Sequence, residues 1–303
     1  MTATVKVSLL YNREAGGDTS LDRIRSALTL HGHDLVRVVT DRVNLPRLLD
    51  PPVDVVLSAG GDGTAAAAAR ALAGRTTPLA ILPLGTANNI ARSVGYVGSI
   101  EDLIGGLRYE RRRPLDLGTA SGPWGSRTFV ESVGGGVIAT GIATMRARRM
   151  TSREPPVVKL SRAVRGYHEL LAEQEPRPCS LLVDGTKLDG EFLLVEVLNT
   201  RWIGPNFELS PDADPSDGRF TVVLARESDR QALCAYVRGR VLKRDCRLTL
   251  TTYRAQQIEI HGLRTVHVDD EVLGVPSGAS VAISIEPAAL ELLEPGPTVD
   301  RSS

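Results

Sequence analysis

Glycines surround a single aspartate in the segment LSAGGDGTAAAAARAL, residues 57–72. Gly60, Gly61 and Gly63 can adopt positive φ, and they carry no Cβ that would keep a phosphate away from backbone N–H groups. A helix that begins near Thr64 would add its positive N-terminal dipole and a hydroxyl donor. These residue types therefore favour an anion site.

Asp62 does not suit a passive anion site, because a carboxylate repels phosphate. It becomes useful if it binds Mg²⁺ or accepts a proton from an attacking hydroxyl. The GGDGT loop is thus more typical of phosphoryl transfer than of simple anion binding. The alternative is a tight turn in which Asp62 only caps the following helix.

A second glycine loop lies in LPLGTANNIAR, residues 82–92. It brings small and polar residues to another predicted helix start: Gly85, Thr86, Asn88 and Asn89. Arg92 lies one turn into that helix and could reach a phosphate. Alone this loop is an ordinary helix cap, but two such loops at successive strand ends favour a shared site.

Strands and helices alternate over the first third of the chain. The predicted strands are 5–11, 34–40, 53–59 and 78–83; the predicted helices start at Ser20 after a loop at Gly16–Gly17, at Asp41, near Thr64 and near Ala87. This order predicts a parallel sheet with helices on both faces. Ligands bind beyond the carboxyl ends of such strands, where both glycine loops lie.

The pattern changes near residue 115. One further helix is predicted at 157–174, and the rest reads as short strands with frequent turn signals such as the Asp-Gly pairs at 184–185 and 189–190. This pattern predicts an antiparallel sandwich. The fold class is therefore α/β plus mostly β, with an α/β nucleotide-binding domain at 1–115 and a β-rich domain at 116–286.

Composition excludes several classes of protein. The 303 residues hold 36 basic and 36 acidic side chains, so nothing indicates nucleic acid binding. Three well-separated cysteines form neither a disulfide framework nor a zinc motif. No secretory leader or long apolar span is visible, so we expect a cytoplasmic protein with at most peripheral membrane contact. A homodimer is left open.

Other motifs compete poorly with the two loops. The P-loop pattern is absent. The segment GGGVIATG, residues 134–141, has the outline of a dinucleotide fingerprint, but no strand ending in an acid follows at the required distance. His267 lies on a predicted strand, and we expect a core or surface histidine there and not a metal ligand.

Taken together, the motifs resemble the diacylglycerol kinase catalytic-domain superfamily, and within it the soluble bacterial lipid kinases related to sphingosine kinase. Besides the two loops, the matching segments are YNREAG (11–16), PLDLG (114–118), FVESVGGG (129–136), KLSRAVRGY (159–167), PDADPSDGRFTVVL (211–224) and VDDE (268–271). The resemblance covers nearly the whole chain. It implies a nucleotide domain and a lipid domain with the active site between them, and a chain end (287–303) that returns to the first domain.

The resemblance also implies transfer of the γ-phosphoryl group from ATP–Mg²⁺ to a lipid hydroxyl of diacylglycerol or sphingosine type. Glu271 is the expected general base, and Asp62 would position the metal and phosphate or help to deprotonate the acceptor. The expected nucleotide-binding residues are Asn12, Arg13, Gly60, Gly61, Gly63, Thr64, Gly85, Thr86, Asn88, Asn89 and Arg92.

Three further groups of residues follow from the resemblance. Asp214 and Asp217 could hold a second metal with support from Asp116, or could form only an acidic surface turn. Trp202 and Phe207 could line an acyl groove, or belong to the core. Several arginines could face anionic headgroups, namely Arg146, Arg148, Arg149, Arg162 and Arg165.

The chain departs from the family pattern at four places. Arg13 replaces a proline, Asn89 an aspartate, Glu131 an asparagine and Asp270 a glycine. None of these changes removes the carboxylates that the chemistry needs. Two alternatives stay open: a kinase of the same fold that acts on a soluble alcohol, as NAD kinase does, and a nucleotide- or lipid-binding protein without turnover.

Overall fold

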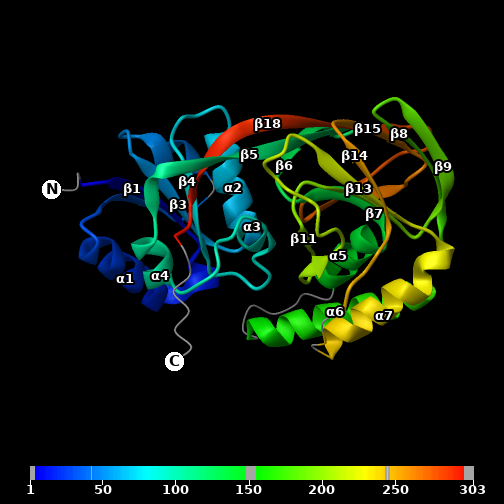
Figure 1. The fold of residues 1–303 in the computed structure, drawn as a ribbon, viewed down its shortest axis with the longest axis horizontal. Coiled ribbons are helices and arrows are strands. Elements are labelled where there is room, and N and C mark those ends of the chain that lie inside the picture. Colours follow the sequence, from blue (N-terminus) through cyan, green and yellow to red (C-terminus); the bar gives the residue numbers. More distant parts are fainter. Residues whose placement is uncertain (1–3, 42, 148–154, 243, 245, 297–303) are drawn as a thin grey trace. The chain divides into compact units, whose positions relative to one another are not determined.

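The computed structural model describes residues 4–296, apart from residues 42, 148–154, 243 and 245 (Figure 1). The chain divides into two compact units. The first unit comprises Met1–Leu115 and Ala288–Ser303, and the second comprises Asp116–Pro287.

The first unit is built on a parallel sheet with the strand order β2-β1-β3-β4-β18. Its strands are β1 Lys6–Tyr11, β2 Asp34–Val39, β3 Val55–Gly60, β4 Leu79–Pro83 and the end of β18 Ser280–Glu294. Its helices are α1 Arg13–Leu30, η1 Leu45–Leu49, α2 Asp62–Leu72, α3 Asn89–Ser93 and α4 Ile100–Gly105. Strand β3 is buried along its whole length, as expected for a strand covered on both faces.

The last strand of this sheet comes from the far end of the chain. Leu292 of β18 pairs with Leu79 of β4 in a parallel register, and Leu290, Leu292 and Leu293 are buried. The Tyr96 hydroxyl donates a hydrogen bond of 2.6 Å to the Leu293 carbonyl. The first unit therefore takes one strand of its sheet from residues that follow the whole second unit in sequence.

The second unit contains an antiparallel sheet with the order β14-β13-β10-β7-β16-β17. Its strands are β7 Ser132–Gly136, β10 Leu194–Leu198, β13 Phe220–Ala225, β14 Thr251–Ala255, β16 Thr265–Val268 and β17 Glu271–Gly274. Opposite lie β8 Arg177–Val183, β9 Thr186–Phe192, β15 Gln257–His261 and the start of β18, also antiparallel. Strands β5 Arg108–Gly122 and β6 Gly125–Phe129 form a hairpin, and β11 Trp202–Ile203 pairs with β12 Phe207–Glu208.

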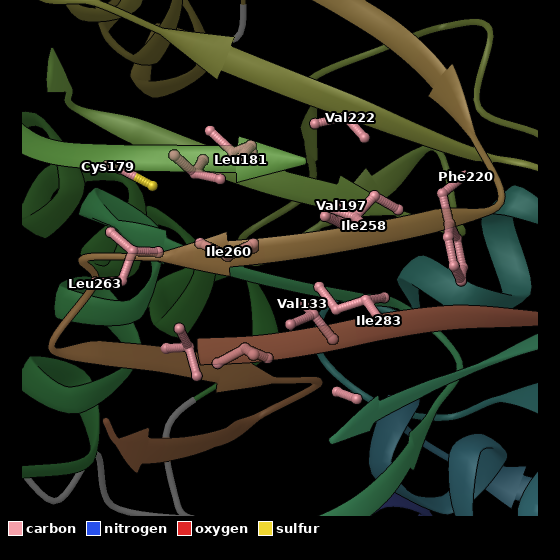
Figure 2. Close-up of a cluster of buried hydrophobic side chains, with 14 of the residues drawn as sticks. Val133, Cys179, Leu181, Val197, Phe220, Val222, Ile258, Ile260, Leu263 and Ile283 are labelled. Carbon is pink, nitrogen blue, oxygen red and sulfur yellow. The ribbon is translucent and has the colours of Figure 1, made fainter. Parts of the chain in front are cut away.

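Two apolar layers hold the second unit together. Side chains from both sheets, among them Val133, Val197, Leu181 and Ile260, fill the space between them (Figure 2). On its other face the six-stranded sheet is covered by α5 Val137–Ala147, α6 Pro156–Glu173 and α7 Arg230–Val241, with the short helix η2 Glu227–Asp229 before α7. Alternate residues of each strand thus enter different cores, as the period of two requires.

Several local predictions were wrong. Helix α1 begins at Arg13, directly after β1, so Gly16–Gly17 lie inside it and Ser20 is not its cap. Asn12 caps the helix instead, because its side chain accepts a hydrogen bond of 3.0 Å from the Glu14 N–H. The segment after Asp41 forms only the 3₁₀ helix η1.

Helices α4, α5 and α7 were not predicted at all. Helix α5 has the sequence VIATGIATMRA, whose β-branched residues and glycine disfavour a helix. Tertiary packing explains it, because a Cβ on Gly141 would lie 2.2 Å from the Tyr167 ring. The glycine that weakens the helix is the residue that lets α6 pack against it.

Candidate active site

The two glycine loops of the first unit pack directly against each other. The N–H groups of Leu84 and Gly85 donate hydrogen bonds of 2.8 and 3.1 Å to the Gly60 carbonyl. A Cβ on Gly85 would lie 2.3 Å from the Cα of Gly61. Two backbones can approach this closely only where side chains are missing. The loops after β3 and β4 are therefore one structural unit.

Asp62 links these loops by capping a helix that is not its own. It is the first residue of α2, yet its Oδ1 accepts a hydrogen bond of 2.9 Å from the Ile90 N–H at the start of α3. Burial raises the pKa of Asp62, and hydrogen bonds from the Ile90 and Asn89 N–H groups oppose that rise without reversing it. The structure thus holds an acid whose ionised form is disfavoured, at the junction of the loops.

Asn88 fastens the second loop. It has the left-handed φ of 53°, its Oδ1 accepts a hydrogen bond of 2.9 Å from the Gly85 N–H, and its Nδ2 donates one of 3.0 Å to the Gly85 carbonyl. Asparagine tolerates this conformation better than most residues. Asn89, which follows, is buried at the start of α3, whereas Thr86 and Arg92 are exposed.

The other predicted nucleotide-binding residues lie near the same strand ends. The Asn12 N–H donates a hydrogen bond of 2.9 Å to the Ala59 carbonyl, which places the end of β1 beside the end of β3. Arg13 is exposed, and Thr64 is buried. A Cβ on Gly60 would meet the Thr64 hydroxyl at 2.4 Å, so this glycine is also required by packing. Parallel strands therefore bring all three loops to one edge of the sheet.

In the second unit, Glu271 begins β17 with about half of its side chain exposed. Its Oε2 lies 3.7 Å from Nε of Arg127. The turn before it is fixed by Asp269, whose φ is 49° and whose Oδ1 accepts hydrogen bonds of 3.1 and 2.8 Å from the N–H groups of Val130 and Glu131. Asp270 does not need positive φ, so an aspartate in place of the family's glycine adds no backbone strain.

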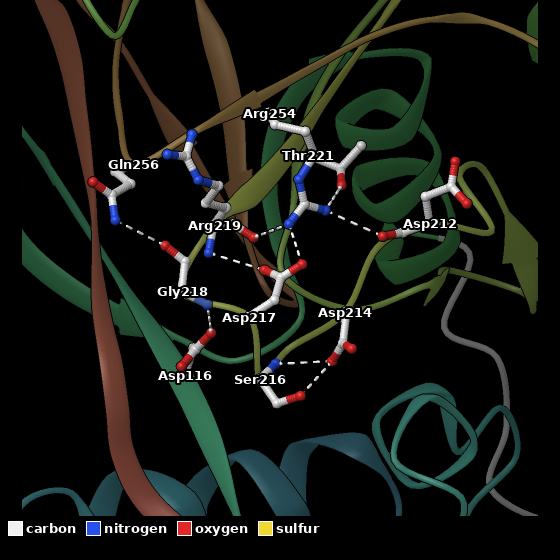
Figure 3. A network of polar contacts seen from close by, with 10 residues as sticks. All are labelled: Asp116, Asp212, Asp214, Ser216, Asp217, Gly218, Arg219, Thr221, Arg254 and Gln256. Carbon is white, nitrogen blue, oxygen red and sulfur yellow. Dashed lines mark hydrogen bonds and ion pairs between the residues drawn. The ribbon is translucent and has the colours of Figure 1, made fainter.

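The three aspartates expected at a second metal have other partners (Figure 3). Asp214 accepts hydrogen bonds from the backbone and hydroxyl of Ser216, Asp217 pairs with Arg254, and Asp116 accepts one of 2.7 Å from the Gly218 N–H. Over the described ranges, no three His, Cys, Asp or Glu side chains are grouped to hold a metal ion. The geometry thus favours the surface-turn alternative, and we propose no metal there.

The residues expected to meet a lipid divide into buried and exposed ones. Phe207 is buried, with its ring 5.1 Å from that of Tyr167, so the core alternative accounts for it. Trp202 is half-buried and lies under the Arg240 guanidinium at 5.7 Å. Among the arginines, Arg146, Arg162 and Arg165 are exposed, and Arg148 and Arg149 lie outside the described residues.

A buried pair of ionisable side chains, Glu196 and His267, was missed by sequence reasoning. His267 Nε2 lies 2.8 Å from Glu196 Oε1, and both side chains are almost fully enclosed. The available signal was Glu196 itself, a single acid inside the apolar strand LVEVL. Such a residue implies a buried partner, because an unpaired carboxylate would be too costly to desolvate.

Two family models match the chain in succession. Residues 6–120 match the diacylglycerol kinase catalytic domain, and residues 136–294 match the YegS C-terminal NAD kinase beta sandwich-like domain. The chain belongs to this family of kinases. The family, the enzyme class and the fold class expected from the motifs are therefore confirmed.

Individual relatives agree with the family models. The chain is 29% identical to a protein named diacylglycerol kinase from Mycobacterium tuberculosis, over 96% of this chain and 95% of the relative. It is also 29% identical to a "Probable lipid kinase YegS-like" from Klebsiella pneumoniae, over 69% of this chain and 70% of the relative. A solved structure of a diacylglycerol kinase from Bacillus anthracis has a TM-score of 0.71 at 20% identity, covering 99% of this chain and 100% of that one. This last likeness concerns the fold.

In the part of the chain that the structure describes, no helix is both long enough and apolar enough to span a membrane.

Proposed function

We propose that the protein transfers the γ-phosphoryl group of ATP to the hydroxyl of a diacylglycerol-like lipid. The observation that carries this proposal is the fusion of the two glycine loops around Asp62 in the first unit. Phosphoryl transfer depends on positioning and on charge neutralisation more than on covalent chemistry, and this junction offers backbone at close range beside one acid.

The loops fit a nucleotide phosphate for a physical reason. Gly60, Gly61 and Gly85 leave the backbone open where a Cβ would fill the space, and the N-terminus of α2 adds a partial positive charge. Asn12 and Arg13 stand at the neighbouring strand end. We assign these residues, with Asn88, Asn89 and Arg92, to ATP binding.

Asp62 would hold Mg²⁺, which neutralises charge on the transferred group when it is bound. Its carboxylate oxygens are hard ligands of the kind that Mg²⁺ prefers. A nearby cation would also favour the ionised form that burial disfavours. The role of Asp62 as a cap of α3 is compatible with this, since a carboxylate has two oxygens.

Glu271 would act as the general base. It lies at the start of β17, is accessible to solvent, and has Nε of Arg127 3.7 Å from its Oε2. It would take the proton of the lipid hydroxyl as the oxygen attacks the γ-phosphorus. The acceptor class rests on the names of the relatives, and peripheral membrane contact would bring the enzyme to such a lipid.

Helix α6 offers a surface for that contact. Val157 and Val158 are 63% and 45% exposed at its start, and Arg162 and Arg165 are exposed within the next turns. Apolar side chains beside arginines suit the interface of an anionic membrane.

The test is transfer of ³²P from [γ-³²P]ATP with MgCl₂ in mixed micelles of dioleoylglycerol, followed by organic extraction. Label in the organic phase with wild type, and a loss of about 10²-fold or more with Glu271→Gln, is expected. NAD in a parallel reaction tests a soluble acceptor. Label only in the aqueous phase would favour a soluble-alcohol kinase, and ATP binding without transfer would favour a protein without turnover.

A further inference from the structure

The buried pair of Glu196 and His267 is built across three neighbouring strands. Antiparallel register pairs Glu196 of β10 with Gly134 of β7, and Gly134 with His267 of β16. Residues that are paired in register point to the same face of a sheet. Two strands with one between them are about 10 Å apart, so the two side chains must cross over the middle strand to meet.

Gly134 makes that crossing possible. A Cβ at this position would lie 2.3 Å from Oε2 of Glu196, which no side chain tolerates. Gly134, in the segment SVGGG of β7, therefore leaves room for the contact between Glu196 of β10 and His267 of β16. His267 Nε2 lies at ion-pair distance from Glu196, and neither Glu196 oxygen has a hydrogen-bond partner of regular geometry among the described residues.

The histidine ring joins this pair to the turn before Glu271. Nδ1 of His267 lies 2.8 Å from the backbone carbonyl of Asp269. A carbonyl can only accept, so Nδ1 carries a hydrogen, while Nε2 lies 2.8 Å from Glu196 Oε1. The ring thus makes one contact with β10 and one with the turn.

Hydrogen bonds of Asp269 also hold the turn in its shape. It has two residues, Asp269 and Asp270, and the first holds a left-handed conformation that is unfavourable for a residue with a Cβ. The Asp269 N–H donates to the Ser132 carbonyl, and its carboxylate accepts from the Val130 and Glu131 N–H groups. The His267 ring holds its remaining polar group, the carbonyl.

We propose that Glu196 and His267 form a positioning pair, which holds the Asp269 turn and, through it, sets Glu271 in the geometry for proton abstraction. This inference rests on the proposed role of Glu271. Neither residue touches a substrate in this scheme; both act through the backbone that carries the base.

The charges around the pair are consistent with this role. Burial alone would lower the pKa of His267, but Glu196 and Asp269 outweigh it, so the pKa is raised. Tyr167 of α6 lies near Glu196, and burial, Glu196 and Glu131 all raise the pKa of Tyr167, which keeps it neutral. At the turn, Arg146 from α5 lies 3.4 Å from Asp270.

Two substitutions of His267 separate the contacts of the ring. Glutamine places its amide near Nε2 and can keep the contact with Glu196, whereas asparagine places its amide near Nδ1 and can keep the donation to Asp269. If the pair positions Glu271, His267→Gln lowers kcat by about 10-fold or more with KM for ATP within about twofold, because misplacement of a catalytic group affects the chemical step. His267→Asn keeps the donation to Asp269 but loses the contact with Glu196, so its kcat lies between those of wild type and His267→Gln.

Hydrogen exchange gives a readout that does not depend on catalysis. Amides of residues 269–272 exchange faster in His267→Gln than in His267→Asn, while those of β13 stay unchanged. The matched control is His261→Gln, which removes an exposed histidine 3.1 Å from Glu259 and leaves both readouts at wild-type values.

Equal kcat losses in the two His267 variants, or an unchanged kcat in the folded His267→Gln protein, would overturn the proposal. So would a kcat loss without faster exchange at the turn. A wild-type rate for Glu271→Gln would instead remove the proposed base, and the exchange data would then still decide whether the pair holds the turn.

Discussion

At the scale of single residues, Asp62 combines two tasks that conflict. Its carboxylate caps α3 through the Ile90 N–H, which any acceptor oxygen could do, yet burial raises its pKa, so the ionised form is costly. A half-buried acid at a position where an amide would cap equally well indicates that its charge serves something other than folding.

Substitution of Asp62 separates capping from charge. Asp62→Asn keeps an oxygen for the Ile90 N–H and removes the charge, so we expect an unfolding temperature equal to or above that of wild type at pH 8. The sign follows from the raised pKa of Asp62 in the folded protein. The protonated carboxyl is the form that folding favours, so wild type loses stability as the pH rises through this pKa, and the uncharged asparagine does not. Transfer activity should fall by about 10²-fold or more across a Mg²⁺ titration.

Asp62→Ala is the matched variant for that experiment. It removes the cap as well, and should lower the free energy of unfolding by about 1 kcal/mol or more, relative to Asp62→Asn. Full activity in Asp62→Asn would leave Asp62 as a capping residue only.

At the scale of elements, the decisive feature is how closely the loops after β3 and β4 approach. Each loop alone looks like a common helix start, and only their contact makes one site. Asn88 and the glycines Gly60, Gly61 and Gly85 make that contact possible, so these residues are required for the loop structure whether or not a ligand is bound.

We expect Gly85→Ala to disrupt the loop pair. Its Cβ would lie 2.3 Å from the Gly61 Cα, and backbone cannot yield as a flexible side chain can. The free energy of unfolding should fall by about 1–3 kcal/mol, and ATP affinity by about 10-fold. Denaturant melts and calorimetric titration with ATP measure the two effects.

The control for this substitution is Gly274→Ala in the second unit. A Cβ there meets nothing within 4 Å, and the residue does not need positive φ. Both quantities should therefore stay within error of wild type. If Gly85→Ala also kept the wild-type free energy of unfolding and ATP affinity, the close approach of the two loops would not be required.

At the scale of the whole molecule, the first unit depends on both ends of the chain. One strand of its sheet is the last part of β18, and Leu290, Leu292 and Leu293 are buried in it. Folding of the first unit must therefore wait until the second has been synthesised, because the strand that completes the sheet follows it in sequence.

Deletion of residues 288–303 should unfold the first unit. Burial of each leucine contributes about 1.5–3 kcal/mol, so the three together approach the whole net stability of about 5–15 kcal/mol. A chain that ends at Gly296 keeps the strand and should melt like wild type. Circular dichroism melts compare the two truncated proteins. A cooperative transition at the wild-type temperature in the protein without residues 288–303 would show that the first unit does not depend on the end of β18.

The sequence by itself determined the family, the order of strands and helices in the first third, and both glycine loops, because short-range patterns encode these features. It did not reveal α5, whose poor helix propensity is overcome by the packing of the Tyr167 ring against Gly141. Nor did it reveal that Asn12 caps α1. Only the tertiary structure decided that Asp62 caps the helix of the other loop, that Asp214 and Asp217 have separate partners, and that Glu196 meets His267 over Gly134. Except for the local contact of Asp214 with Ser216, each of these joins residues far apart in sequence, and neither spacing nor propensity records which distant side chains the fold brings together.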